Sequence, residues 1–573
     1  MVYFAEVDSS STDAEEVHAD FSEDEDFLTR SVISHGSPEQ SSSGNKRGRI
    51  EFITHRLLSA LDKCKISDYN AMHLIMATAE ALGVNTDTLV LNRSSLYRMR
   101  KEFREKKFKE VQQNFQLGNM TSLVLHWDTK LLSEFREHQT FERLPVLVSF
   151  EGKCQLLNVP RLENATGKIQ AEAIHDVLHE WGIDNKVKAL CCDTTASNTG
   201  YLKGACVILE HLLEKDLMYL PCRRHIFELV LRAVFEAKLE SSTTSPDVQL
   251  FKRFRDQWPT INPEIFVSGI EDKIVEQHIH NSRDSLLQFC LSFLQESLCR
   301  DDYKELLELT ILFLGGSLTR KTTFHYPGAF HHARWMSKAI YCLKIYMFRK
   351  QFCLKSTEEH QLRDICIFIV KVYVESWFRC PNAVAAPFND FIFLKALADY
   401  PDPIISEVAL RKFCNHLWYL SPEAVALSLF DERVSTDTKR KMVKAMTCTE
   451  NTQKGIKKYA LSIQHVKDTV SQDLSQFVTT QSLNAFSRFE VSTEFLKLDP
   501  DKWGTDTHYN EALNVFSKIL VTNDVAERGV KLIQEYINIL PKDDEQRQFL
   551  LHVVCEYRSK YPDSKKQTLQ KPT

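Results

Sequence analysis

Short apolar runs and helical periodicity alternate between residues 113 and 239 of the chain. The runs have the length of strands, and the stretches between them place apolar residues three and four positions apart, as in a helix with one buried face. The predicted strands are 122–129, 144–150, 154–162, 187–192 and 217–222, and the predicted helices are 167–181, 204–213 and 226–239. The pattern therefore predicts three strands, then a helix, a strand, a helix, a strand and a helix.

This order of elements is that of a ribonuclease-H-like α/β fold, in which helices flank a mixed sheet. After the fifth strand, residues 240–510 show almost no strand pattern and indicate successive helices, for example 286–298, 303–314, 337–348, 362–378 and 404–420. We interpret 240–510 as a large all-helical insertion domain that interrupts the α/β core of residues 113–239. Residues 511–560 are again helical and are expected to complete the core, before a polar tail at 561–573.

The N-terminal region begins acidic. Residues 1–45 are rich in Ser, Asp and Glu with few large apolar groups, which predicts a disordered tail. Phe21 and Phe27 lie among the acids, so an interaction tail is an alternative to a plain solvated one. The short basic patch Lys46–Arg49 is compatible with nuclear localisation without being diagnostic.

Residues 46–112 are predicted to form a helical, helix-turn-helix-like segment. One helix begins at Ser67 or Asp68 and ends at Gly83, and a strongly basic helix follows over 92–107. A helix pair with a basic second helix is typical of a DNA reader. The residues expected to contact DNA are Arg93, Arg98, Arg100, Lys101 and Arg104. The alternative is a solvated helix face or a linker helix.

Composition narrows the class of protein. The net charge of −5 argues against a generally basic nucleic-acid coat protein, and the charge is unevenly distributed. The 15 cysteines have no framework spacing, and no apolar segment follows Met1, which favours a reducing compartment. No run approaches the roughly 20 apolar residues of a membrane span. We expect an intracellular protein with no membrane partner.

Two predicted strands end in an aspartate. Asp128 follows the first strand and Asp193 the fourth, and these strands are neighbours in the predicted topology. Nucleases of this fold use three carboxylates to hold two Mg²⁺ ions. The third candidate is Glu527, near the start of a helix capped by Asn523 or Asp524. Glu527 could instead be the capping-box partner of Asp524, and spacing alone does not separate the two interpretations.

Several segments resemble motifs of the hAT superfamily of DNA transposases. Asp128 matches the first acid of that family, and Asp193 in Cys-Asp-Thr-Thr-Ala-Ser-Asn matches the second. Cys222–His225 is similar to a Cys-x-x-His signature. Arg334–Tyr341 resembles an Arg-Trp-x-Ser-x-x-x-Tyr box, and Asn523–Val530 resembles the segment that holds the third acid. The resemblance extends from about residue 120 to residue 540.

The resemblance implies a cut-and-paste DNA transposase, or a host-retained descendant of one, that acts in the nucleus. It implies an Asp128, Asp193 and Glu527 triad that binds two Mg²⁺ ions, with Mn²⁺ as an alternative. Double-stranded DNA, as transposon ends and target, and further copies of the chain are the implied partners. His225 is expected near the active site, where it touches DNA, or else is a core histidine. Arg334 and Trp335 are expected to clamp a phosphate and stack on an unpaired base, and the alternative for Trp335 is a buried helix residue.

The chain also departs from that family. No Cys-x-x-Cys and His-x₃₋₅-His pattern precedes the core, so the helix pair would replace the usual zinc-finger DNA reader. Cys222 and His225 are only two ligands, which do not make a zinc site, and Val530 stands where the family has Phe. Two alternatives remain. The first is a non-enzymatic DNA-binding or regulatory protein derived from a transposase. The second is a ribonuclease-H-like exonuclease, which the large helical insertion disfavours.

Overall fold

The computed structural model describes residues 53–84, 91–117, 122–134, 139–239, 248–296, 301–318, 324–327, 336–447, 456–523, 529, 532–533 and 543–561. The chain forms two units, residues 1–54 and 55–573, and the helices and strands described all belong to the second. The predicted acidic tail, the basic patch Lys46–Arg49 and the C-terminal tail from residue 562 lie outside the described residues.

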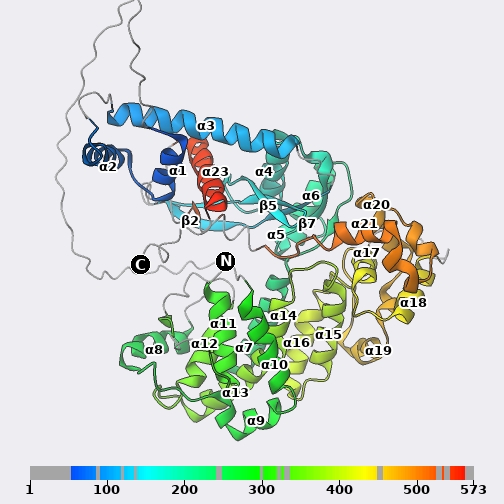
Figure 1. The fold of residues 1–573 in the computed structure, drawn as a ribbon. Helices are drawn as coiled ribbons and strands as arrows, with labels where there is room; N and C mark the ends of the chain where they lie inside the picture. The colour runs from blue at the N-terminus through cyan, green and yellow to red at the C-terminus, as the bar shows by residue number, and fades with distance from the viewer. Residues whose placement is uncertain are drawn as a thin grey trace, which may run out of the picture. The chain divides into compact units, whose positions relative to one another are not determined.

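A mixed five-stranded sheet has the order β5-β4-β1-β7-β8 (Figure 1). The strands are β1 Leu123–Trp127, β4 Val146–Phe150, β5 Lys153–Asn158, β7 Val187–Cys191 and β8 Met218–Tyr219. β4 pairs antiparallel with β1 and β5, whereas β7 pairs parallel with β1 and β8. All five residues of β1 are buried, as expected of a central strand covered on both faces. The mixed sheet predicted from the five apolar runs is confirmed.

A second, three-stranded sheet was not predicted. It consists of β2 Lys130–Glu134, β3 Gln139–Arg143 and β6 Arg161–Leu162, in the order β2-β3-β6. The sequences of β2 and β3 carry several charged or polar residues and few β-branched ones, so periodicity did not identify them. The predicted strand 154–162 is divided into β5 and β6, and Pro160 between them cannot donate to a ladder.

The two faces of the main sheet pack against different helices. Leu147 and Leu156 cluster with Leu532, Ile533 and residues of the C-terminal helix α23, Asp544–Lys560. The opposite face joins the larger core, which includes apolar residues of α4, Gly167–Glu180, and α6, Ala205–Leu212. The predicted helices 167–181 and 204–213, together with α23 in the predicted helical region 511–560, therefore cover the sheet on both sides.

Three helices precede the sheet: α1 His55–Lys63, α2 Asp68–Ala81 and α3 Arg93–Leu117. Ser67 caps α2, as predicted, by accepting a hydrogen bond from the backbone of Asn70 at 3.2 Å. α3 continues ten residues past the predicted end at 107 and crosses the predicted domain boundary at 112. It packs on α23, where the ring of Phe108 lies 5.0 Å from that of Phe549. α3 is therefore part of the same unit as the sheet.

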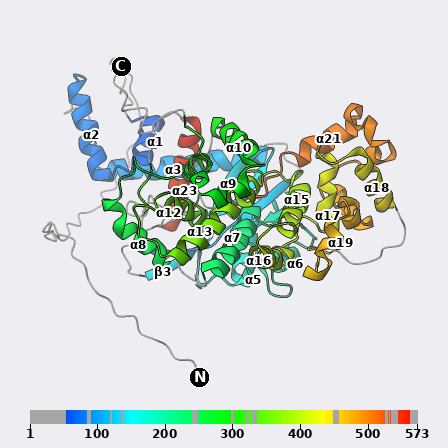
Figure 2. The same cartoon turned by 90° about the horizontal axis from the view of Figure 1, so that it is seen from below.

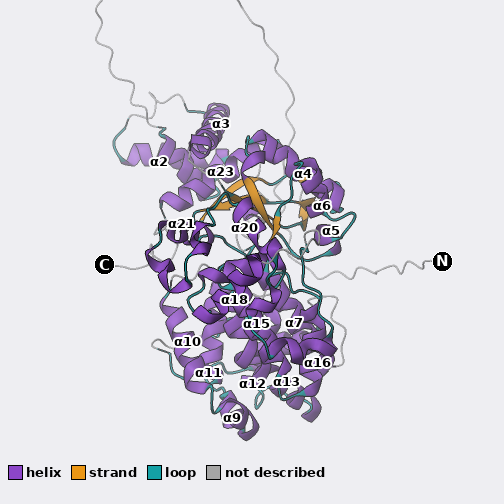
Figure 3. Cartoon of the chain, turned by 90° about the vertical axis from the view of Figure 1, so that its right-hand side faces the viewer, coloured by secondary structure: helices purple, strands orange, loops and turns teal. Residues whose placement is uncertain are grey.

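The rest of the unit is helical, and Figure 3 shows its strands gathered in one part. Two further helices follow strands of the main sheet, the four-residue α5, Ala196–Thr199, after β7, and α7, Arg223–Leu239, after β8. The later helices are α8 Gln249–Gln257, α9 Lys273–Ile279, α10 Arg283–Gln295, α11 Asp301–Phe313, α12 Ser337–Met347, α13 Ser356–Phe368, α14 Val374–Phe378, α15 Ala386–Ala398, α16 Pro403–Cys414, α17 Pro422–Val425, α18 Thr436–Thr447, α19 Val466–Val470, α20 Leu483–Arg488 and α21 Thr507–Phe516. No helix among the described residues has the length and apolarity needed to cross a membrane.

α7 connects the sheet to the helical domain. It begins just after β8, at the edge of the sheet, and packs along α16 and α13 (Figures 1 and 2). Its apolar residues belong to the same continuous core as those of the sheet and of the later helices. The predicted boundary at residue 240 is thus a change in secondary structure, and the hydrophobic core is continuous across it.

Candidate active site

Asp128 and Asp193 lie at equivalent positions on neighbouring parallel strands. The last paired residues of β1 and β7 are His126 and Cys191, and each aspartate stands two residues beyond. Their exposed fractions are only 5 % and 7 %. Carboxyl ends of parallel strands are where α/β sheets hold ligands. The structure therefore brings together the two aspartates that the sequence singled out.

A turn after β7 fixes the Asp193 carboxylate. Its Oδ1 accepts hydrogen bonds from the Thr195 backbone at 3.0 Å, the Thr195 hydroxyl at 2.6 Å and the Asn198 side-chain amide at 2.7 Å. The oxygen of the same Asn198 amide accepts a hydrogen bond from the Trp127 indole at 3.0 Å. Asn198 thus joins the end of β1 to the end of β7. It bonds Trp127, which precedes Asp128, and it bonds Asp193 itself.

These contacts keep Asp193 ionised. Burial alone raises the pKa of Asp193, but the nearby His225 and the hydrogen bonds from Thr195 and Asn198 outweigh burial and hold that pKa below its usual value. His225 lies in the first turn of α7 and is only partly buried. This electrostatic effect indicates that His225 lies near Asp193, whereas contact with DNA stays a prediction.

Asn523 brings a distant part of the chain to the same edge of the sheet. Its side-chain amide donates to the backbone carbonyl of Trp127 at 2.8 Å, and its Oδ1 lies 3.1 Å from Nδ1 of His126. Its backbone N–H donates to the Cys222 sulfur at 3.3 Å. His126 is held in turn by Ser149 on β4, with 2.8 Å between Nε2 and the hydroxyl. The sequence indicated Asn523 as a possible helix cap and as the start of the segment that resembles the third-acid motif, but not as a partner of Trp127 and His126.

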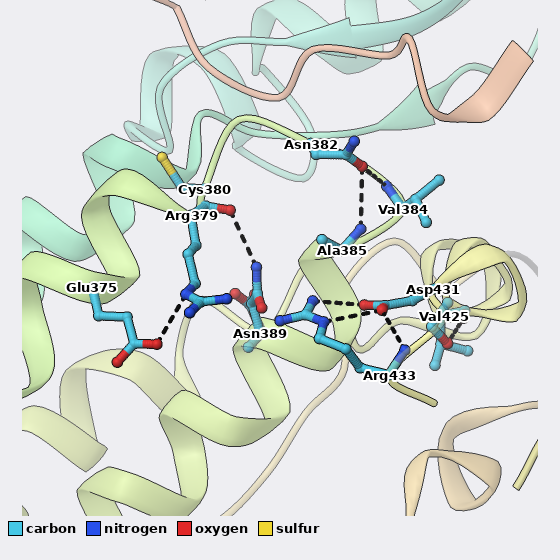
Figure 4. Close-up of polar contacts among 12 residues, drawn as sticks. Glu375, Arg379, Cys380, Asn382, Val384, Ala385, Asn389, Val425, Asp431 and Arg433 are labelled. Atoms are coloured by element: carbon cyan, nitrogen blue, oxygen red, sulfur yellow. Dashed lines mark hydrogen bonds and ion pairs between the residues drawn. The ribbon is translucent and has the colours of Figure 1, made fainter. Parts of the chain in front are cut away.

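A loop of the helical domain supports the segment that leads to Asn523. Asn382 forms an antiparallel bridge with Leu520, and Val521 donates to the carbonyl of Pro381 at 3.0 Å. Figure 4 shows this loop: the Asn382 side chain accepts hydrogen bonds from the Val384 backbone at 2.8 Å and from the next residue, while the returning segment passes above it. The helical domain therefore contributes directly to the geometry of the sheet edge.

Arg223, the first residue of α7, joins the helical domain to the segment that returns to the sheet. The sequence did not indicate this role. The backbone N–H of Arg223 donates to Val521 at 3.1 Å, and its guanidinium pairs with Asp390 on α15 and donates to the Cys380 carbonyl at 3.2 Å. Arg223 and Asp390 side chains are each only 1 % exposed. Nothing in the local sequence distinguishes Arg223 from a surface arginine, because its partners lie more than 150 residues away.

Three predicted site residues, Glu527, Arg334 and Trp335, lie outside the described residues. The structure does describe Gly529, two residues after Glu527, and Met336, the residue after Trp335. Gly529 lies against Pro145 and Leu156. Met336, with a left-handed backbone (φ 61°), donates its N–H to Glu228 of α7 at 2.6 Å.

The basic helix corrects part of the DNA prediction. Arg100 and Arg104 are buried, with exposed fractions of 3 % and 7 %. Both pair with Asp62 of α1, Arg104 at 2.8 Å, and Arg100 also pairs with Asp68 at 2.6 Å. These two arginines hold α3 against α1 and α2, so their guanidinium groups are not presented to DNA. Arg93, Arg98 and Lys101 are exposed and keep that prediction.

Among the residues that the structure describes, no three His, Cys, Asp or Glu side chains are grouped as metal ligands. Glu527, the predicted third carboxylate, lies outside the described residues and is therefore not included. Cys222 is buried and accepts the hydrogen bond from Asn523.

No protein-family model matches the chain, and no match was found among curated proteins. The assignment of a function therefore depends on the site itself.

Proposed function

We propose that this protein is a Mg²⁺-dependent DNA strand-cleaving enzyme of the Asp-Asp-Glu type, a hAT-like transposase or a descendant of one. The observation that carries the proposal is the equivalent placement of Asp128 and Asp193 at the ends of two paired strands. The strand order β5-β4-β1-β7-β8, with three antiparallel and then parallel strands, supports a ribonuclease-H-like core.

The residues on both sides of Glu527 support it as the third acid. Asn523 is hydrogen bonded to Trp127, next to Asp128, and four residues of chain reach at most about 14 Å. On the other side, Gly529 lies next to Pro145, since a Cβ built on Gly529 would lie 3.1 Å from the Pro145 side chain. The β1–β4 register pairs Trp127 with Val146, so Pro145 stands opposite Asp128 when the register is continued by one residue. Both anchors of the segment 523–529 thus lie beside Asp128.

The donor set suits hard divalent cations. Carboxylate oxygens are the ligands that Mg²⁺ prefers, and two buried carboxylates at neighbouring strand ends repel each other unless positive charge lies near them. Asp128, Asp193 and Glu527 would hold the ions, which when bound activate water and neutralise charge on the leaving oxygen. The chain itself keeps Asp193 ionised, through Thr195, Asn198 and His225, and so ready to bind a cation at neutral pH.

The Arg334–Trp335 pair is proposed to act on the cleaved DNA end. Met336, the next residue, is tied to Glu228, which stands one helical turn after His225 on α7. Glu228 also accepts a hydrogen bond from the Tyr373 hydroxyl. Met336, the residue after the pair, is therefore joined to the helix that also carries His225, the residue whose charge lowers the pKa of Asp193.

The test is DNA cleavage by the purified full chain, with and without Mg²⁺, on plasmids that carry candidate terminal repeats. Asp128→Asn, Asp193→Asn and Glu527→Gln should each abolish cleavage and leave DNA binding intact. Asp176→Asn is the matched control, because that side chain is 85 % exposed on α4. Binding without cleavage by the unaltered chain would instead support the non-enzymatic DNA-binding alternative. Undiminished cleavage by the Asp193 variant would refute the triad.

A further inference from the structure

The turn after the second acid presents two large apolar side chains to solvent. Tyr201 is 89 % exposed and Leu202 is 78 % exposed, and Lys203 beside them is also exposed. No other large apolar residue in the described part of the chain reaches these fractions. Exposing two such side chains side by side is unfavourable in water, and a partner that covered them would remove that cost.

Glycines hold this tip rigidly. A Cβ on Gly200 would lie 2.5 Å from the carbonyl oxygen of Ala196, and one on Gly204 would lie 2.5 Å from the backbone of Gly200. A Cβ on Gly167 of α4 would lie 2.3 Å from the carbonyl oxygen of Lys203. The backbone N–H of Gly204 also donates to Gly200 at 2.9 Å. Backbone packs directly on backbone at each end of the turn, so the exposed side chains project from a fixed base.

The base of the tip is the turn that holds Asp193. The tip occupies the β7–α6 connection, on the carboxyl edge of the sheet. A Cβ on Gly204 would also lie 2.6 Å from the carbonyl oxygen of Asn198. Asn198 donates to the Asp193 carboxylate. Asn198 therefore links Gly204, at the base of the tip, to the Asp193 carboxylate.

We propose that Tyr201 and Leu202 form a wedge that inserts between base pairs of duplex DNA next to the cleaved phosphate, with Lys203 beside the backbone. The inference rests on the proposed function, since DNA is the molecule that must reach this edge. Apolar side chains inserted at a base step unstack it and kink the duplex, and aromatic rings stack on bases of any sequence.

A protein partner fits the tip less well than DNA does. Stable protein interfaces bury about 800 Å² on each partner, spread over about 20 residues. The neighbouring Thr195 and Ala196 are exposed but small, and Lys203 is charged. Two side chains on a narrow, rigid turn are too few for such an interface, whereas a DNA wedge needs only the apolar side chains that enter a base step.

The experiment measures base unstacking separately from cleavage. Duplexes carry 2-aminopurine at successive positions of a candidate terminal repeat, and emission is recorded on addition of the full chain without Mg²⁺. The unaltered chain should raise emission at one step. Tyr201→Ser with Leu202→Ser should remove that rise and lower Mg²⁺-dependent cleavage about 5- to 150-fold, the range that corresponds to the loss of one stacked base. Tyr201→Phe should retain both.

Two further measurements keep the result interpretable. The melting temperature of the double variant should be unchanged, because both side chains are exposed. Ile265→Ser, at a residue 62 % exposed in the helical domain, is the matched control and should behave as the unaltered chain. Binding without any rise in emission overturns the wedge even if cleavage occurs. A rise that depends on Tyr201 supports the wedge even if the chain does not cleave DNA, so the wedge and the enzymatic function fail separately.

Discussion

The side-chain amide of Asn523 donates a hydrogen bond to the backbone carbonyl of Trp127 across 396 positions of sequence. Trp127 is the last residue of β1 and immediately precedes Asp128. The bond therefore fixes the segment returning from the helical domain at the end of the strand that delivers the first acid. Through this contact, the helical domain fixes the position of Asn523, four residues before the proposed third acid Glu527.

Asn523→Ala should impair cleavage more than DNA binding. The substitution removes the hydrogen bond from Asn523 to the buried Trp127 carbonyl and one of the hydrogen bonds of the buried His126, and losing a buried hydrogen-bond partner costs about 1–3 kcal/mol of stability. Chemical denaturation and cleavage kinetics measure the two effects. Asn510→Ala is the control, because its exposed side chain on α21 donates to the Gly504 carbonyl and bonds neither Trp127 nor His126. Normal cleavage by the Asn523 variant would show that this anchor does not position Glu527.

Asn198→Ala should raise the pKa of Asp193. In the folded chain that pKa lies below its usual value, so the ionised carboxylate stabilises the fold above pH about 3.9, and this contribution is lost as the pH falls through the folded-state pKa. Removing the Asn198 hydrogen bond reduces the contribution. It should also move the acidic limb of the cleavage profile to higher pH. The pH dependence of unfolding and of cleavage tests this.

A suitable comparison for that variant is Thr199→Ala. The Thr199 hydroxyl donates to the Thr194 and Thr195 carbonyls and does not bond Asp193. The acidic limb of the cleavage profile of Thr199→Ala should stay at the pH of the unaltered chain. An equal shift of this limb in both variants would mean that the turn as a whole had changed. Asn198→Ala also deprives the buried Trp127 indole of its acceptor, which should cost about 1–3 kcal/mol.

The exposed and buried cations of α3 should respond differently to substitution. Reversal of Arg93, Arg98 and Lys101 to Glu should weaken DNA binding with little change in stability. The slope of affinity against salt concentration should become shallower by about 0.9 for each DNA phosphate that the helix no longer neutralises. Filter binding or fluorescence anisotropy over a range of salt concentrations measures both quantities. An unchanged slope would leave α3 as a structural helix only.

Arg100→Gln should instead destabilise the protein. It leaves Asp62, which is fully buried on α1, with one fewer cation, and breaking a buried ion pair typically costs about 3–5 kcal/mol. Arg104 still pairs with Asp62, so the loss should fall toward the lower end of that range. Thermal unfolding gives the effect directly, and a variant that is fully stable but defective in DNA binding would restore Arg100 as a DNA contact.

His552 should make the fold sensitive to acid. Burial lowers the pKa of His552 to about 4, although its contact with the Leu157 carbonyl opposes the shift. The unfolded chain, with a histidine pKa of about 6.5, binds the proton first, so stability is complete above pH 6.5 and falls by about 3 kcal/mol as the pH drops to 4. His552→Gln retains a donor for Leu157 and should flatten this dependence in urea unfolding. His179→Gln, at a side chain 82 % exposed, should not.

Local sequence pattern determined the five strands of the main sheet and the positions of two acids, but not the second sheet. The five apolar runs became the main sheet because buried strands need continuous apolar residues, and Asp128 and Asp193 were recognisable as the carboxylates that end two of them. Ser67 was likewise recognisable as a cap, since capping depends on residues three positions apart.

Long-range contacts decided the rest. Arg98 and Arg100 are two residues apart on one basic helix, yet one is exposed and the other is buried against Asp62, 38 positions earlier. The supporting roles of His126, Asn523 and Arg223 follow from partners that are distant in sequence. Charge and periodicity are properties of neighbours along the chain, whereas burial and hydrogen bonding depend on which surfaces meet when helices and strands pack. For that reason the sequence alone identified the two aspartates, and only the tertiary structure revealed the residues that hold them in place.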